Sequence, residues 1–201
     1  VKGSVVADAM AVFGAPPAGL VPGHPIAGTE RSGVEASFAE LYRGRRVILT
    51  PLPGTDAEAL ALVTRMWHTC GADVSCMEVS HHDEILAATS HLPHMLAFGL
   101  VDTLTQMQEN DEIFRYAAGG FRDFTRIAAT DPVMWRDVFL TNKDAVLEML
   151  GRFSEDLSAL QRAIRWSDGD ALFDLFTRTR DIRRAIIDAG QETDVPDFGR
   201  H

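Results

Sequence analysis

The chain has 201 residues, of which 46% are apolar and 24% charged, and this composition is typical of a globular protein. Its formal net charge is −10 with no basic patch, so we expect no nucleic-acid surface. No apolar run approaches the roughly 18 residues of a membrane span, and no signal-peptide pattern leads the chain. Cys70 and Cys76 lack the Cys-x-x-Cys spacing and are expected to be free, buried thiols. We therefore expect an acidic, soluble, cytoplasmic protein.

The first 79 residues have the pattern of α/β structure. The expected elements are a short helix after Gly3 that is broken at 14–19, a turn-rich extended segment at 20–30, a short helix from Phe38 to Tyr42, a strand at 46–51, a helix opened by the capping box Thr55-x-x-Glu58 with Gly71 as its C′ residue, and a strand at 73–79. Strand, helix and strand in this order predict the last part of an α/β unit.

From Ser80 onward the pattern is helical. Ser80 can cap a long helix that is apolar on most sides, and such a helix is expected to be buried, here by a partner chain. Pro93 should kink this helix. Helices then continue through the arginine-containing segment 118–137, and two more are expected at 141–166 and 168–188. We divide the chain into an α/β part at 1–79, an all-α part at 80–189 and a loose tail at 190–201.

His24 is a candidate for proton transfer. It precedes Pro25, which holds the histidine in an extended conformation, and Gly23 and Gly28 flank the pair. A histidine fixed on a stiff loop suits acid–base chemistry. The alternative is a turn histidine without a role.

The segment 118–137 is a candidate for anion binding. Gly119 and Gly120 allow unusual torsions or the close approach of a ligand. Arg122 and Arg126 are four apart and share a face if the segment is helical, and a guanidinium grips carboxylates in a bidentate manner. The alternative is an amphipathic helix whose arginines are solvated or paired with neighbouring aspartates.

A cluster of histidines lies on the long predicted helix. His91 and His94 are spaced as metal ligands can be, and His82-Asp83 is a dipeptide used by some metal-dependent phosphohydrolases. His-Glu-x-x-His is absent, so we expect no metal site and keep a metal-dependent hydrolase as a distant alternative. No Gly-x-Gly-x-x-Gly or P-loop is present within the chain.

Three motifs in this order resemble the prephenate/arogenate (cyclohexadienyl) dehydrogenase family. They are His-Pro-Ile-Ala-Gly-Thr-Glu at 24–30, Ser-His-Leu-Pro-His at 90–94, and Gly-Gly-Phe-Arg-Asp-Phe-Thr-Arg-Ile-Ala at 119–128 followed by Asp-Pro-Val-Met-Trp-Arg-Asp at 131–137. The resemblance extends to about residue 188. It implies the last part of a dinucleotide-binding α/β domain followed by an all-α, helical dimerisation domain.

The resemblance also implies a reaction and residue roles. The family oxidatively decarboxylates prephenate or arogenate, with hydride transfer to NAD or NADP, in tyrosine biosynthesis. His24 would hydrogen-bond the ring hydroxyl and help it lose its proton. The remaining implied site residues are Arg126 for the side-chain carboxylate of the substrate, His94, Glu30, Gly120 and Trp135 in the substrate pocket, and Lys2 and Pro25 on the cofactor side. The helical domains of two subunits would pack into a homodimer.

One departure from the family keeps two functions open. The nucleotide fingerprint would lie before Val1, and so would a serine near the nicotinamide that the family places just before this segment. We expect the chain to be part of a longer dehydrogenase. The alternative is a non-catalytic dimerisation or ligand-binding module without the cofactor half. The preferred substrate, the choice of NAD or NADP, and tyrosine feedback stay open.

Overall fold

A computed structural model describes residues 1–28, 33–108 and 110–191. The elements are α1 (Lys2–Phe13), β1 (Gly23–Pro25), the 3₁₀ helix η1 (Val34–Ala36), β2 (Arg46–Leu49), α2 (Ala57–Thr69), β3 (Asp73–Cys76), α3 (Val79–Leu86), the π-helical turn η2 (Ala87–His91), α4 (Leu92–Thr105), α5 (Asn110–Arg115), α6 (Gly119–Thr125), the 3₁₀ helix η3 (Arg126–Ala129), α7 (Pro132–Thr141), α8 (Lys143–Arg165), α9 (Gly169–Ile186) and the π-helical turn η4 (Ile187–Gln191). The described residues form two compact units, one within 1–147 and one from 148 on, and each is considered by itself.

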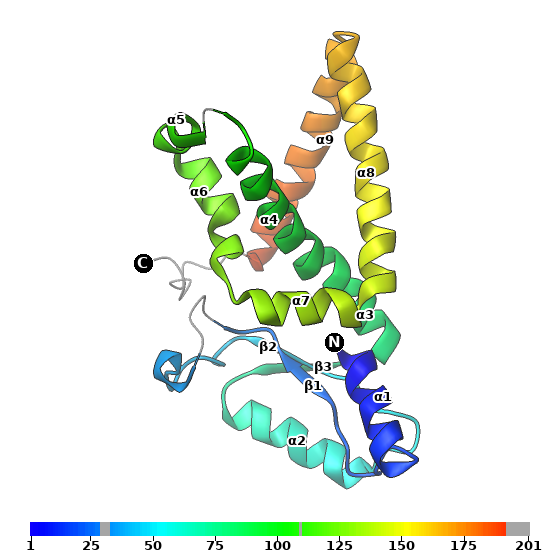
Figure 1. The fold of residues 1–201 in the computed structure, drawn as a ribbon. Coiled ribbons are helices and arrows are strands. Elements are labelled where there is room, and N and C mark those ends of the chain that lie inside the picture. Colours follow the sequence, from blue (N-terminus) through cyan, green and yellow to red (C-terminus); the bar gives the residue numbers. More distant parts are fainter. Residues whose placement is uncertain (29–32, 109, 192–201) are drawn as a thin grey trace. The chain divides into compact units, whose positions relative to one another are not determined.

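A small sheet with strand order β1-β2-β3 organises the first unit (Figure 1). The central strand β2 pairs antiparallel with β1, which places His24 opposite Ile48, and parallel with β3. Helix α2 connects the two parallel strands and packs Trp67 against the buried Val47 and Leu49. Parallel strands joined through a helix form a βαβ unit, so the expected α/β beginning of the chain is confirmed.

The start of α2 lies one residue later than the capping box predicts. The carboxylate of Asp56 accepts the backbone N–H of Glu58 at 2.8 Å and caps the helix. The hydroxyl of Thr55 instead accepts the N–H of Leu52 at 2.8 Å, so it closes the preceding turn. At the other end Gly71 adopts a φ of 80° beyond the C-cap, as expected of a C′ glycine.

Other local expectations are wrong. Residues 38–42 form consecutive turns rather than a helix, since so short a segment does not offset the cost of helix nucleation. Ser80 lies inside the first turn of α3, where Glu78 is the N-cap and no side chain caps the helix. Cys70 and Cys76 are free but exposed rather than buried, because they lie at the ends of α2 and β3.

The long helix expected after residue 80 is formed in three parts, α3, η2 and α4. Pro93 lies in the first turn of α4, and a proline cannot donate the regular helical hydrogen bond of its position. The expected kink therefore takes the form of the π turn η2 immediately before it. This turn carries His91, which is 5% exposed, while Leu100 further along α4 is 36% exposed.

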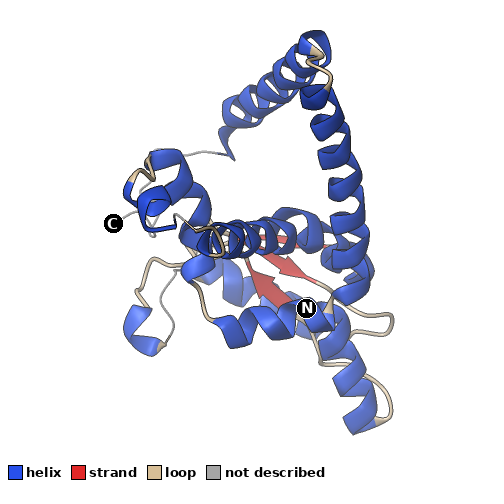
Figure 2. Cartoon of the chain, turned by 45° about the horizontal axis from the view of Figure 1, so that its top comes forward, coloured by secondary structure: helices blue, strands red, loops and turns tan. Residues whose placement is uncertain are grey.

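The remainder of the described chain is helical (Figure 2). The arginine-containing segment forms α6, η3 and α7, as predicted, and η3 and α6 both pack against α4. Helices α8 and α9 follow closely the predicted helices at 141–166 and 168–188, and the carboxylate of Asp168 caps α9 by accepting the N–H of Ala171. In the part of the chain that is described, none of the helices has the length and apolarity that crossing a membrane requires. The predicted tail lies outside the described residues from 192 on.

Candidate active site

His24 belongs to a relay of hydrogen-bonded side chains. Its Nδ1 lies 2.9 Å from Nε2 of His82, and Nδ1 of His82 lies 2.7 Å from Oδ1 of Asp83. His24 comes from β1 and its two partners from α3, so the relay joins the sheet to α3. The side chain of His82 is 1% exposed, and both of its ring nitrogens are satisfied within the protein.

Asp83 anchors this relay on the N-terminus of α1. Its Oδ1 accepts the backbone N–H of Lys2 at 2.9 Å, and its Oδ2 accepts that of Gly3 at 2.8 Å. A Cβ atom at Gly3 would come within 2.9 Å of Oδ2, so only glycine allows this approach without moving the carboxylate. Burial alone would raise the pKa of Asp83, but the hydrogen bonds from His82, Lys2 and Gly3 outweigh it and lower the pKa to about 2. Asp83 is therefore an anion at neutral pH.

The charge of Asp83 determines which ring nitrogens carry protons. A carboxylate only accepts hydrogen bonds, so the neutral ring of His82 donates from Nδ1 and accepts at Nε2. His24 must then donate from its Nδ1 to His82. In neutral His24 the lone pair consequently lies on Nε2, the nitrogen that the relay does not use. Burial first, and the nearby Lys2 cation second, lower the pKa of His24 to about 4, so the ring is neutral at physiological pH and can accept a proton.

A second group of side chains surrounds His94. Its ring stacks on Trp135 with centroids 3.6 Å apart and planes 23° apart, and its Nδ1 donates to the carbonyl of Ser90 at 2.8 Å. Burial lowers the pKa of His94, and the nearby charge of Arg126 contributes to the same shift. The indole Nε1 of Trp135 is buried and has no hydrogen-bond partner among the described residues. A buried donor without a partner is costly, and a ligand with an acceptor would satisfy it.

Asn142, the C-cap of α7, connects the two groups. Its Nδ2 lies 2.9 Å from the backbone carbonyl of Asp83 and 3.2 Å from Nδ1 of His91. The His91 ring in turn meets Trp135 edge to face, with centroids 6.1 Å apart. The relay that ends at His24 and the stacked pair His94–Trp135 therefore belong to one continuous network.

The other residues singled out from the sequence are placed as follows. Pro25 follows His24 on β1 and is half-buried. Gly120 lies in the first turn of α6 without a positive φ, so of the two possibilities it is the close approach of a ligand that the open space beside it leaves as a prediction. Glu30 lies outside the described residues. Arg136 pairs with Asp137 at 2.7 Å on the surface.

Sequence reasoning missed the relay partners of His24. His82 and Asp83 were considered only as a metal-binding dipeptide, yet both ring nitrogens of His82 are already engaged within the protein. Among the described residues no group of three or more His, Cys, Asp or Glu side chains is arranged to hold a metal ion. Asn142 gave no signal, because a single amide beside a helix end usually serves as a cap.

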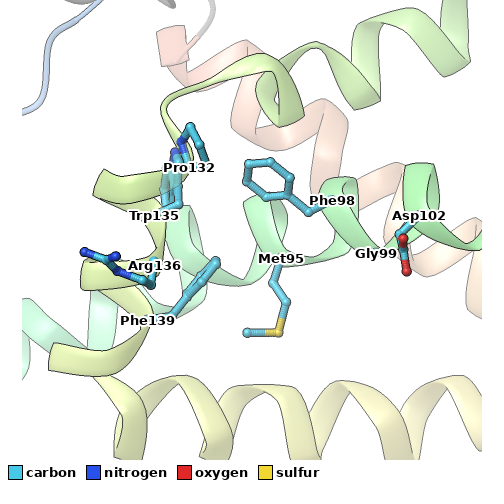
Figure 3. Close-up of a pocket in the computed structure, with 8 residues that line it drawn as sticks. All are labelled: Met95, Phe98, Gly99, Asp102, Pro132, Trp135, Arg136 and Phe139. Carbon is cyan, nitrogen blue, oxygen red and sulfur yellow. The ribbon is translucent and has the colours of Figure 1, made fainter.

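A cavity of about 510 Å³ opens beside Trp135, between α4 and α7 (Figure 3). Its lining is mostly apolar: Met95, Phe98 and Gly99 come from α4, and Pro132, Trp135 and Phe139 come from α7. Figure 3 shows the polar side chains, Arg136 and Asp102, at opposite ends of this apolar wall.

We expect the stability of the protein to fall as the pH drops from 6.5 toward 4. Burial lowers the pKa values of both His24 and His91 to about 4 from an ordinary 6.5. Within this window the unfolded chain binds protons that the folded chain does not, so acidification favours unfolding. Thermal melts between pH 7 and 5 measure this effect, and His91→Gln should reduce the slope. His81→Gln is the matched control, because the side chain of His81 is 62% exposed, and a Tm that is independent of pH would contradict the assignment.

Comparison with known proteins shows which family has this sequence and fold. Residues 1–76 match the family model for the nucleotide-binding domain of prephenate dehydrogenase, and residues 78–178 match the model for its dimerization domain. The cyclohexadienyl dehydrogenase of Zymomonas mobilis is 43% identical over 169 residues, which cover 83% of this chain and 58% of that protein.

Solved structures agree. The prephenate dehydrogenase of A. aeolicus, in complex with hydroxyphenyl propionate and NAD+, superposes with a TM-score of 0.85 at 43% identity and covers 92% of this chain and 64% of that one. The arogenate dehydrogenase of Synechocystis superposes with a TM-score of 0.78 at 26% identity, over 92% of this chain and 66% of that one. This chain thus spans less than two thirds of the length of each of these relatives.

Proposed function

Because this chain belongs to the prephenate dehydrogenase family, we propose that the whole protein oxidatively decarboxylates prephenate, arogenate or both, with hydride transfer to NAD or NADP, in tyrosine biosynthesis. The observation that carries the proposal is the relay His24–His82–Asp83. It presents a neutral imidazole with its lone pair on Nε2 beside the first turn of α1, within the part that matches the nucleotide-binding domain.

His24 is the proposed proton acceptor. The substrate is a cyclohexadienol, and its ring hydroxyl loses a proton to Nε2 of His24 while the hydride leaves the same ring carbon. The ring carboxylate departs as carbon dioxide, its bonding electrons enter the ring, and the ring becomes aromatic. NAD or NADP, when bound, accepts the hydride. Pro25 follows His24 on β1, and the charge of Lys2 is close enough to lower the pKa of His24, which fits our proposal that both residues lie on the nicotinamide side.

Arg126 and its neighbours form the proposed substrate pocket. The guanidinium would bind the side-chain carboxylate, since a planar fork suits a bidentate anion. Its charge is close enough to lower the pKa of His94, and His94 stacks on Trp135, so these residues share one region. The unpartnered indole N–H of Trp135 supports a polar contact to substrate there. We assign Gly120 and Glu30 to this pocket only because they match the family motifs.

The test is reduction of NAD and NADP by the full-length protein, followed by nicotinamide absorbance, with prephenate and then arogenate. We expect turnover with at least one of these substrates. Ligand binding without reduction by either cofactor would favour the alternative, a dimerisation or ligand-binding module that does no chemistry.

We also propose that the helical part, residues 80–189, forms a homodimer and that residues 1–79 belong to the cofactor-binding domain. Residues 78–178 match a dimerization domain, and α8, α9 and the turn between them leave Ile164, Phe173 and Trp166 at 65%, 69% and 73% exposure. At about 25 cal/mol per Å², burying roughly a few hundred Å² of such apolar surface on each subunit contributes a free energy that is large beside a typical folding free energy. Light scattering should therefore find a dimer, and a stable dilute monomer would contradict the proposal.

We propose that the protein is cytoplasmic, because the free thiols of Cys70 and Cys76 suit a reducing compartment.

A further inference from the structure

Asn142 is buried at the junction between α7 and α8, and the mechanism above gives it no role. It is 8% exposed, and its backbone serves both helices: its N–H donates to the carbonyl of Val138 at 3.0 Å, and its carbonyl accepts the N–H of Val146 at 3.0 Å. An asparagine at a helix start commonly turns its side chain toward that helix. Here the amide nitrogen reaches across to α3 and η2 instead.

The contacts fix the orientation of the amide. The backbone carbonyl of Asp83 can only accept, so the atom 2.9 Å from it must be the nitrogen Nδ2. The second hydrogen on Nδ2 then points to Nδ1 of His91 at 3.2 Å, which makes Nδ1 the acceptor and leaves the His91 proton on Nε2. Both hydrogens of the amide are thus used, one by the Asp83 carbonyl, which also accepts the backbone N–H of Ala87, and one by Nδ1 of His91.

We infer that Asn142 is a positioning residue. It fixes the relay of His24, His82 and Asp83 relative to Trp135, which lines the cavity between α4 and α7. It fixes the backbone of Asp83, whose carboxylate orients His82 and through it His24. It also fixes the ring of His91 against Trp135. A shift of Asn142 would move the proton acceptor and one wall of the substrate pocket together. The inference rests on the proposed dehydrogenase function.

The first test is a double-mutant cycle in the full-length protein. Asn142→Ala should lower kcat about tenfold in the wild-type background, the value of one ordinary hydrogen bond. In the His24→Asn background the same change should lower kcat less than about twofold, because two residues that act through one chain are not additive. Equal losses in both backgrounds would show a general structural effect and would overturn the inference.

Two variants keep this test decisive. Thr141→Ala, at the neighbouring exposed position, removes a methyl group and a hydroxyl bonded only within α7, to the carbonyls of Asp137 and Val138, and should leave kcat unchanged. Asn142→Asp keeps the shape of the side chain and carries the cycle if the alanine variant does not fold. It replaces the donor by an acceptor that faces Asp83 and His91.

The second test does not depend on turnover. With ¹⁵N-labelled histidine, the signals of His91 in the full-length wild type should report a proton on Nε2. In Asn142→Asp they should report a proton on Nδ1, because the new carboxylate needs a donor. An unchanged His91 signal would overturn the inference. If the full-length protein turned over neither substrate, the proposed function would fail while this readout would still test the placement of Asn142.

Discussion

His24→Asn should lower kcat by about 10²- to 10⁴-fold, the usual contribution of a general base, with little change in KM. Asparagine retains an N–H that can donate to Nε2 of His82, so the relay and the fold should survive. It lacks a basic nitrogen, so the hydroxyl proton of the substrate would have no acceptor. Nicotinamide absorbance with saturating substrate measures the loss.

The pH profile separates this role from a structural one. Since burial lowers the pKa of His24 to about 4, the wild-type kcat/KM should stay level as the pH drops well below 6.5. Circular dichroism at each pH has to show that the protein is still folded. His68→Asn is the control, because His68 is exposed on α2 and its Nδ1 hydrogen-bonds the backbone carbonyl of Ala72, away from the relay. A loss in kcat of less than about threefold for His24→Asn would remove His24 from the chemistry.

Local patterns predicted most of the fold. The strand at 46–51, the C′ glycine at 71 and the last two helices follow from signals that act within a few residues, and the structure has them. The errors arise where two local signals compete. Thr55 and Asp56 can each cap α2, and the aspartate does so because the threonine closes the turn before it.

The candidate site was only partly visible in the sequence. His24 and His94 were found by motif, and the structure provides each with a specific partner. The residues that position them were not found, because their roles depend on contacts across 58 or 59 residues of chain. The hydrogen bond between the neighbouring residues His82 and Asp83 leaves no periodic pattern in the sequence. The contact of the Asp83 carboxylate with the N-terminus of α1 follows from tertiary packing alone.

Arg126→Ala should raise KM for prephenate or arogenate by about 10- to 150-fold with a smaller change in kcat, because a hydrogen bond to a charged group contributes about 1.5–3 kcal/mol. The carboxylate that Arg126 would bind lies on the side chain of the substrate, away from the reacting ring. Its loss should therefore weaken binding of the ground state and the transition state to a similar degree. KM for the nicotinamide cofactor should not change.

Two further variants, Arg126→Lys and Arg122→Ala, test whether the substrate carboxylate binds to the guanidinium of Arg126 in particular. Lysine keeps the charge but loses the fork, so its KM should lie between wild type and alanine. Arg122 lies four residues earlier on α6 and is exposed, and its removal should leave KM as it is. Arg126 also interacts within the protein, so the Tm of each variant has to be measured beside the kinetics. If Arg126→Ala and Arg122→Ala raised KM equally, the effect would come from the general charge of this surface. The carboxylate site would then have to be sought elsewhere around the stacked rings of His94 and Trp135.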